Sequence, residues 1–171
     1  MPILDTHTLE FVSRSPEQTR RLGARLGALL NRSDVICLSG DLGAGKTTFV
    51  QGVAQGWGSL DAVSSPTFVL VNTYRRADGQ RLYHLDAYRL SGALEAEDLD
   101  LDALMDTGAM LVEWPERIDP VLPRERLWVS LRHMVTETSR GGDEQRGMVI
   151  SSQGKRYDDI LADFRKRVFG G

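Results

Sequence analysis

GDLGAGKT, residues 40–47, matches the G-x-x-x-x-G-K-[ST] pattern of a phosphate-binding loop, or P-loop. Glycines let the backbone of such a loop curl so that successive N–H groups point inward, toward an anion. Lys46 supplies a cation for the outer phosphates, and Thr47 offers a hydroxyl to Mg²⁺. The alternative interpretation is a glycine-rich turn before a helix. The residue types at these positions favour a loop that binds a nucleotide.

The sequence on both sides supplies the context that a P-loop needs. Val35 to Leu38 is typical of a short buried strand, and Thr47 to Gln55 is typical of a helix. Phosphate then meets a helix N-terminus, where unpaired N–H groups and the positive end of the dipole stabilise an anion. Asp41 lies inside this loop, and its carboxylate repels a triphosphate unless it turns outward or holds a water or backbone donor. The sequence leaves these alternatives open.

Length, charge and cysteine content limit the class of protein. A chain of 171 residues suits a single P-loop domain over residues 1–171. The formal net charge of -3 gives no overall basic surface, so direct tight binding of nucleic acid is not indicated. One cysteine, Cys37, excludes a disulfide within the chain. No segment approaches the roughly 18 apolar residues of a membrane span. We therefore expect a cytoplasmic protein that does not contact a membrane.

Patterns along the rest of the chain predict an α/β fold. Ser15 to Gln18 reads as a capping box with proline at the first helical position, so we expect a helix before the first strand. An Asp-Gly turn at Asp78 predicts a hairpin, which makes the sheet mixed. The hairpin strands are expected at residues 67–71 and 81–85, further strands at 109–113, 127–132 and 147–152, a polar loop at 139–145, and a closing helix at 157–168. The predicted class is a P-loop NTPase-like three-layer fold with an open, mixed, partly antiparallel central sheet.

Two carboxylates follow predicted strands. Mg²⁺ prefers octahedral oxygen ligation, which Thr47 and two phosphate oxygens do not complete. Glu113 ends the apolar run 109–113, and Asp86 ends the run 82–86. Open α/β sheets bind ligands at the carboxyl ends of their strands. Each carboxylate, taken alone, fits an ordinary polar strand end equally well, but two of them beside a P-loop indicate a metal site.

Three further features each have two interpretations. His84 shares a strand face with Leu82 and Asp86, so it either orients Asp86 by a hydrogen bond or is a structural histidine. Trp114 either stacks on a nucleotide or partner, or packs as a half-buried indole. The acidic run at residues 95–106 either docks a basic partner or is a solvated helix face.

Four motifs, in chain order, resemble the TsaE family, the bacterial P-loop ATPases of tRNA threonylcarbamoyladenosine synthesis. They are GDLGAGKTTF from Gly40, SPTF at 65–68, HLDAYRL at 84–90 and EWPE at 113–116, and the resemblance runs from the Ser15 helix to about Arg146. It implies that ATP and Mg²⁺ bind and that ATP is hydrolysed while the protein docks on a complex of TsaB and TsaD. That complex modifies the adenosine beside the anticodon in tRNAs that read ANN codons, and tRNA is met only indirectly, through the complex.

The resemblance also implies which residues form the site. Lys46, Asp86 and Glu113 are the expected catalytic residues, and Thr47, Asp86 and Glu113 the expected metal ligands. Thr67 resembles a sensor threonine. The residues expected to bind the nucleotide are Pro16, Asp41, Leu42, Gly43, Ala44, Gly45, Lys46, Thr47, Thr48, Thr67, Asp86, Trp114 and Arg146.

The expected chemistry is positioning and charge stabilisation. Lys46 and Mg²⁺ neutralise charge on the transferred phosphoryl group, and Glu113 or Asp86 orients the attacking water. One alternative is a small-molecule kinase, which needs a second substrate pocket and usually an arginine-rich lid, and no such lid is obvious in the sequence. The other is a nucleotide-gated binding module, in which ATP orders residues 64–68 through Thr67.

Overall fold

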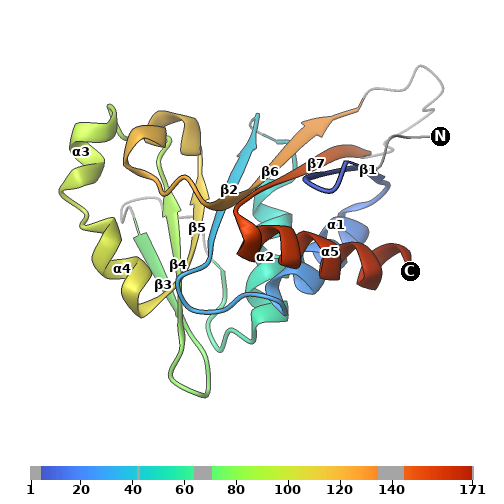
Figure 1. The fold of residues 1–171 in the computed structure, drawn as a ribbon, viewed down its shortest axis with the longest axis horizontal. Coiled ribbons are helices and arrows are strands. Elements are labelled where there is room, and N and C mark those ends of the chain that lie inside the picture. The colour runs from blue at the N-terminus through green and yellow to red at the C-terminus, as the bar shows by residue number, and fades with distance from the viewer. Residues whose placement is uncertain (1–4, 42, 64–70, 135–144, 171) are drawn as a thin grey trace.

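The centre of the molecule is one sheet, to which the described residues contribute seven strands in the order β1-β7-β6-β2-β5-β4-β3 (Figure 1). The computed structural model describes residues 5–41, 43–63, 71–134 and 145–170. The strands are β1 (Thr8–Ser13), β2 (Val35–Gly40), β3 (Val71–Arg75), β4 (Arg81–Asp86), β5 (Gly108–Glu113), β6 (Arg126–His133) and β7 (Arg146–Gln153). The helices are α1 (Pro16–Gly27), α2 (Lys46–Trp57), α3 (Ala93–Glu97), α4 (Leu101–Thr107), α5 (Lys155–Phe169) and the short 3-10 helices η1 (Pro115–Arg117) and η2 (Asp119–Val121).

The sheet is mixed, as the sequence predicts. Strand β2 runs parallel to β5 and β6, and β4 runs parallel to β5. Strands β3, β7 and β1 pair in antiparallel fashion with their neighbours. Because β1 and β3 are the two edges, the sheet is open. The carboxyl ends of the parallel strands β2, β4 and β5 therefore lie side by side.

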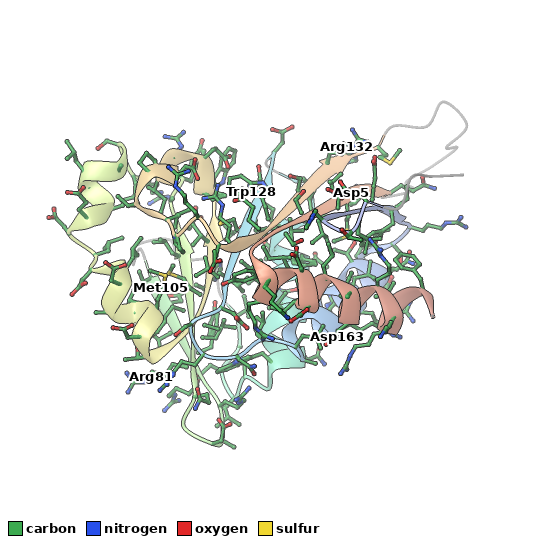
Figure 2. All side chains as sticks on the ribbon, viewed as in Figure 1. Asp5, Arg81, Met105, Trp128, Arg132 and Asp163 are labelled. Carbon is green, nitrogen blue, oxygen red and sulfur yellow. The ribbon has the colours of Figure 1, made fainter. Side chains whose placement is uncertain are left out.

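Side chains of the central strands are buried on both faces, which makes the fold three layers deep. Ile36 and Leu38 pack in one core with residues of α1, α2 and α5. Val35 and Cys37 point the other way, into a second core with residues of α3, α4 and η2. Figure 1 shows α3 and α4 on one side of the central strands and α1, α2 and α5 on the other. In the side-chain view, Met105 lies on α4 and Asp163 on α5, so the two labels mark the two outer layers (Figure 2).

Helices α1 and α2 touch through their backbones. Glycines four residues apart on each helix form the contact: Gly23 and Gly27 on α1, Gly52 and Gly56 on α2. A Cβ atom at Gly27 would lie 2.0 Å from the Val53 carbonyl oxygen, and one at Gly56 would lie 1.8 Å from the Ala24 carbonyl oxygen. Any larger residue would push the helices apart. The P-loop helix is thus held directly against α1.

Several local predictions are confirmed. Helix α1 begins at Pro16, and the Ser15 side chain accepts a hydrogen bond from the Gln18 N–H at 3.1 Å. The hairpin exists, with Val71 opposite Leu85. Most of the predicted strand 67–71 and of the loop 139–145 lies outside the described residues. The P-loop helix and the closing helix are each longer than predicted: α2 spans Lys46–Trp57 and α5 spans Lys155–Phe169.

One prediction about the order of elements is wrong. The first strand, β1, precedes the first helix. It is an edge strand of modest burial whose Leu9 and Phe11 pack on the core. Its partner is β7, in which Ile150 lies opposite Leu9. Because that partner is more than 130 positions away, nothing local in the sequence marks this strand.

The acidic run forms two short helices, α3 and α4, and no single helix spans it. Asp100 separates them in a left-handed conformation with φ 50°, and its side chain caps α4. In the part of the chain that the structure describes, no helix is both long and apolar enough to cross a lipid bilayer.

Candidate functional site

The P-loop turns from the end of β2 into the start of α2. Gly43 and Gly45 have φ values of 80° and 96°, in the left-handed region that favours glycine. The Ala44 N–H donates to the Asp41 carbonyl oxygen at 3.1 Å, which closes the turn between them. A Cβ atom at Gly43 would meet no atom within 4 Å, so this position borders open space. Positive φ values at Gly43 and Gly45 are compatible with a loop whose N–H groups face an anion.

A pocket of about 380 Å³ lies at this loop. It falls within the roughly 300–1,000 Å³ of typical small-molecule sites. The carboxyl ends of β4 and β5 contribute Asp86 and Glu113, which are direct partners in the sheet register. The residues that line it are Gly43, Gly45, Lys46, Thr47, Thr48, Asp86, Glu113, Trp114 and Arg146. Segments from four parts of the sequence therefore meet at the edge where ligands are expected.

Lys46 lies buried beneath an aromatic ring. Its Nζ lies 3.8 Å from the centroid of the Trp114 ring and donates a hydrogen bond to the Gly40 carbonyl oxygen. Burial lowers the pKa of Lys46, and the nearby carboxylates of Glu113 and Asp86 oppose that shift. The cation is held inside the pocket by the residues around it.

Trp114 reaches the lysine because its own backbone bends back. Its φ is 56°, an uncommon value for a bulky residue. Its N–H donates to the Leu38 carbonyl oxygen at 3.3 Å, and its ring packs against Tyr88 with centroids 5.0 Å apart. Trp114 is half-buried, and both sequence interpretations remain compatible with this position: the indole packs, and it also lines the pocket.

Each of the two carboxylates is fixed through one oxygen. Asp86 Oδ1 accepts a hydrogen bond from the Tyr88 N–H at 3.0 Å. Burial raises the pKa of Asp86, the Tyr88 hydrogen bond opposes the shift, and the charge of Glu113 adds to it. Glu113 Oε2 lies 2.7 Å from His84 Nε2. In both groups the second oxygen has no hydrogen-bond partner among the described residues, so it is available to a ligand.

Leu82 packs in the core with residues of α2. Because side chains two positions apart on a strand share a face, His84 lies on the same face, as the alternation predicts. Its ring nitrogens contact Tyr74 and Glu113, however, and not Asp86. The proximity of His84 and Glu113 could not be predicted from the sequence, because it depends on β4 lying next to β5. The His84–Glu113 pair is the part of the site that sequence reasoning missed.

Arg146 lies beneath the P-loop. Its side chain is buried, and Nη2 donates to the Gly43 carbonyl oxygen at 3.2 Å. Its Nε is buried without a hydrogen-bond partner among the described residues. Pro16 does not line the main pocket but borders a small neighbouring cavity of about 30 Å³ with Gly45 and Thr48. Arg146 lines both cavities and so connects the start of α1 with the P-loop.

The remaining predicted residues are placed differently. Asp41 is exposed and Ala44 is buried, and neither lines the pocket. Leu42 and Thr67 lie outside the described residues.

Oxygen donors in the pocket suit a hard cation such as Mg²⁺. The Thr47 hydroxyl, Asp86 and Glu113 all line it. The described residues contain no cluster of three or more His, Cys, Asp or Glu side chains that would hold a metal alone. Mg²⁺ usually binds through one or two carboxylates together with phosphate oxygens and water. The residues therefore fit a metal that arrives with a phosphate ligand.

Comparison with known proteins identifies the family of this chain. The family model "Threonylcarbamoyl adenosine biosynthesis protein TsaE" matches residues 13–141. The tRNA threonylcarbamoyladenosine biosynthesis protein TsaE of Streptomyces coelicolor is 44% identical over 140 residues, which cover 81% of this chain and 93% of that protein. The TsaE protein of Bacillus subtilis is 40% identical over 160 residues, which cover 92% and 94% of the two chains.

A solved structure has the same fold. The crystal structure of Bacillus subtilis YdiB superposes with a TM-score of 0.73 at 33% identity, and the match covers 94% of this chain and 95% of that one. The family match covers well over half of the chain, and both relatives align over most of their length. This chain therefore belongs to the TsaE family of proteins of tRNA threonylcarbamoyladenosine biosynthesis.

Proposed function

We propose that this protein binds ATP with Mg²⁺ in the P-loop pocket and hydrolyses it, and that hydrolysis serves a complex of TsaB and TsaD. The observation that carries the proposal is the convergence of Lys46, Thr47, Asp86 and Glu113 on one pocket at the carboxyl ends of parallel strands. Family membership supports the pathway, and tRNA is then met only through the partner complex.

The P-loop binds the phosphates, and Lys46 stabilises the charge that develops during the reaction. Left-handed Gly43 and Gly45 shape the loop, and the first N–H groups of α2 lie at its end, where they stabilise phosphate. Lys46 supplies a buried cation for the charge that develops on the transferred phosphoryl group. Phosphoryl transfer depends chiefly on such positioning and electrostatics. The loop and Lys46 thus hold the reacting group.

Carboxylates supply the remaining roles. Thr47, Asp86 and Glu113 would hold Mg²⁺, which neutralises charge on the phosphate oxygens when bound. Glu113 or Asp86 orients the attacking water through the oxygen that the protein leaves without a partner. Burial raises the pKa of Asp86, and a cation bound beside this carboxylate would oppose that shift.

The test is ATP hydrolysis by the purified protein with Mg²⁺, alone and with added TsaB and TsaD. Lys46→Ala provides the background in both conditions. Stimulation by the partners, absent in Lys46→Ala, is the expected result. Hydrolysis that the partners leave unchanged would contradict the coupling and direct the search to phosphoryl acceptors, as for a kinase. Tight binding with no turnover in either condition would instead indicate a nucleotide-gated module.

A further inference from the structure

Behind the pocket, three buried side chains form a hydrogen-bonded line. The Tyr74 hydroxyl lies 2.9 Å from His84 Nδ1, and His84 Nε2 lies 2.7 Å from Glu113 Oε2. Tyr74 and His84 are each 2% exposed, and Glu113 is 8% exposed. The three residues come from the adjacent strands β3, β4 and β5, and only Glu113 reaches the pocket.

The chemistry of these groups gives the line a direction. An ionised carboxylate only accepts hydrogen bonds, so His84 Nε2 carries the proton that Glu113 receives. In a neutral imidazole the other nitrogen is then an acceptor, and the Tyr74 hydroxyl donates to it. Each nitrogen of the ring has a partner, and the ring has one orientation in which both contacts are made. Glu113 Oε2 is therefore fixed from behind, while Oε1 has no hydrogen-bond partner among the described residues.

We propose that His84, held by Tyr74, is a positioning residue that fixes the Glu113 carboxylate so that Oε1 is the oxygen presented to the cation or water of a bound nucleotide. The inference deepens the proposed function and rests on it, because it assigns Glu113 to the nucleotide site. His84 itself does not touch the ligand.

The two carboxylates of the site, Asp86 and Glu113, are held in place in different ways. Asp86, opposite Glu113 in the sheet register, is fixed through Oδ1 by a backbone N–H, which needs no further residue. Glu113 ends its strand and is fixed by a side chain instead. A buried imidazole carries a desolvation cost that an apolar residue at this position would avoid. Ligands of metal ions are commonly oriented by such hydrogen-bonded neighbours, whose loss typically weakens metal affinity by about 10- to 100-fold.

Three variants separate a positioning role from simple packing. His84→Leu removes the donor and keeps most of the volume. His84→Gln keeps an N–H donor the same number of bonds from the backbone, so it is the matched control. Tyr74→Phe removes only the outer hydroxyl and leaves His84 in place. Circular dichroism and thermal melting establish that each variant is folded.

The main measurement is the affinity for AMPPNP by calorimetry, once with EDTA and once with Mg²⁺. The ratio of the two dissociation constants reports how well the site uses the cation. We expect His84→Leu to reduce the wild-type gain from Mg²⁺ by about 10- to 100-fold while leaving the metal-free affinity unchanged. His84→Gln should retain the gain, and Tyr74→Phe should lose a smaller part of it. Nitrogen-15 spectra of the ligand-free protein should show His84 protonated on Nε2.

Other outcomes would contradict either the positioning role of His84 or the proposed binding of nucleotide and Mg²⁺. Full Mg²⁺ gain in a folded His84→Leu variant would overturn the positioning role, and so would equal losses in His84→Leu and His84→Gln. If His84→Leu does not fold, Tyr74→Phe with an unchanged Mg²⁺ gain would overturn it. Wild-type protein that binds no AMPPNP, or gains nothing from Mg²⁺, would contradict the proposed function itself.

Discussion

The ammonium group of Lys46 lies 3.8 Å from the centroid of the Trp114 ring, inside the pocket where a nucleotide's phosphates are expected. A cation over an indole is attracted by about 0.5 to 2 kcal/mol, depending on how far it is desolvated. We expect Lys46 to turn from the ring and from the Gly40 carbonyl oxygen when it meets a phosphate. The contact therefore links nucleotide binding to the surroundings of one tryptophan.

Nucleotide binding should change the fluorescence of Trp114. The indole loses an ammonium group from its face when Lys46 moves, so its emission should shift on titration with AMPPNP and Mg²⁺. Trp114 is one of three tryptophans, so Trp114→Phe should remove the response and Trp128→Phe should keep it. A full response in Trp114→Phe would show that the signal comes from elsewhere and that this contact is not broken.

Lys46→Ala should weaken AMPPNP binding by roughly 10- to 150-fold. Hydrogen bonds to charged groups contribute about 1.5 to 3 kcal/mol, which corresponds to that range of dissociation constants. The matched control is Lys155→Ala, because that side chain is 90% exposed on α5. Calorimetric affinities equal in the two variants would contradict a phosphate-binding role for Lys46.

Of Glu113→Gln and Asp86→Asn, the variant that removes the residue orienting the water should lower partner-stimulated ATP hydrolysis by about 10²- to 10⁴-fold, the usual contribution of a well-placed general base. Nucleotide affinity measured in EDTA should stay near the wild-type value, since the change keeps the shape and removes only charge. Glu116→Gln, three residues along the chain, is the control. Asp86→Asn in the same assay assigns the water: whichever variant retains hydrolysis does not orient it.

The contact between His7 and Asp158 should make stability depend on pH. The His7 Nδ1 atom lies 2.8 Å from Asp158 Oδ1, and the hydrogen bond that His7 donates to this carboxylate raises the pKa of His7 above 6.5. That stabilisation is fully present below pH 6.5 and is lost as the pH rises through the raised value. Hydrogen bonds from Ser152 and then His7 lower the pKa of Asp158 below 3.8, so its share is lost only in acid.

A double-mutant cycle with His7→Ala and Asp158→Ala checks this dependence. Urea unfolding should give a larger coupling between the two residues at pH 5.5 than at pH 8.5. Equal coupling at the two pH values, or larger coupling at pH 8.5, would show that protonated His7 does not stabilise the fold.

Gly27→Ala should destabilise the fold, by about 1 to 3 kcal/mol or more, because overpacking in a tight contact has that cost. The expected loss of stability is opposite to the effect in an isolated helix, where replacing glycine by alanine is favourable by about 1 kcal/mol. Here the new Cβ atom would lie 2.0 Å from the Val53 carbonyl oxygen. Ala162→Gly on the exposed face of α5 measures helix propensity alone. Urea unfolding in which Gly27→Ala gains stability would contradict the backbone contact.

The parts of the molecule that the sequence predicted are those with local signals. Glycines 43 and 45 mark the loop, apolar runs mark β2 and β5, and the carboxylates that end β4 and β5 follow from strand direction alone. An α/β fold with a mixed sheet then follows from these strands, the helices between them and the hairpin.

What the sequence could not predict depends on distant partners or unusual backbone. His84 meets Glu113 only because β4 lies beside β5, and β1 exists only because β7 pairs with it. Trp114 covers Lys46 because its φ is positive, a conformation that its residue type disfavours. Strand adjacency and a single backbone angle thus decide the details of the site.

The glycine contact between α1 and α2 has a mechanical consequence. At these glycines the two backbones are in direct contact, so no side chain lies between them that could change its rotamer to accommodate a displacement of one helix. If α2 shifts when its N-terminus binds phosphate, we expect α1 to shift with it, because the two backbones are in direct contact at these glycines. The first turn of α1, at Pro16, borders the small cavity next to the P-loop. We therefore expect a displacement of the α2 N-terminus to change the position of the α1 N-terminus.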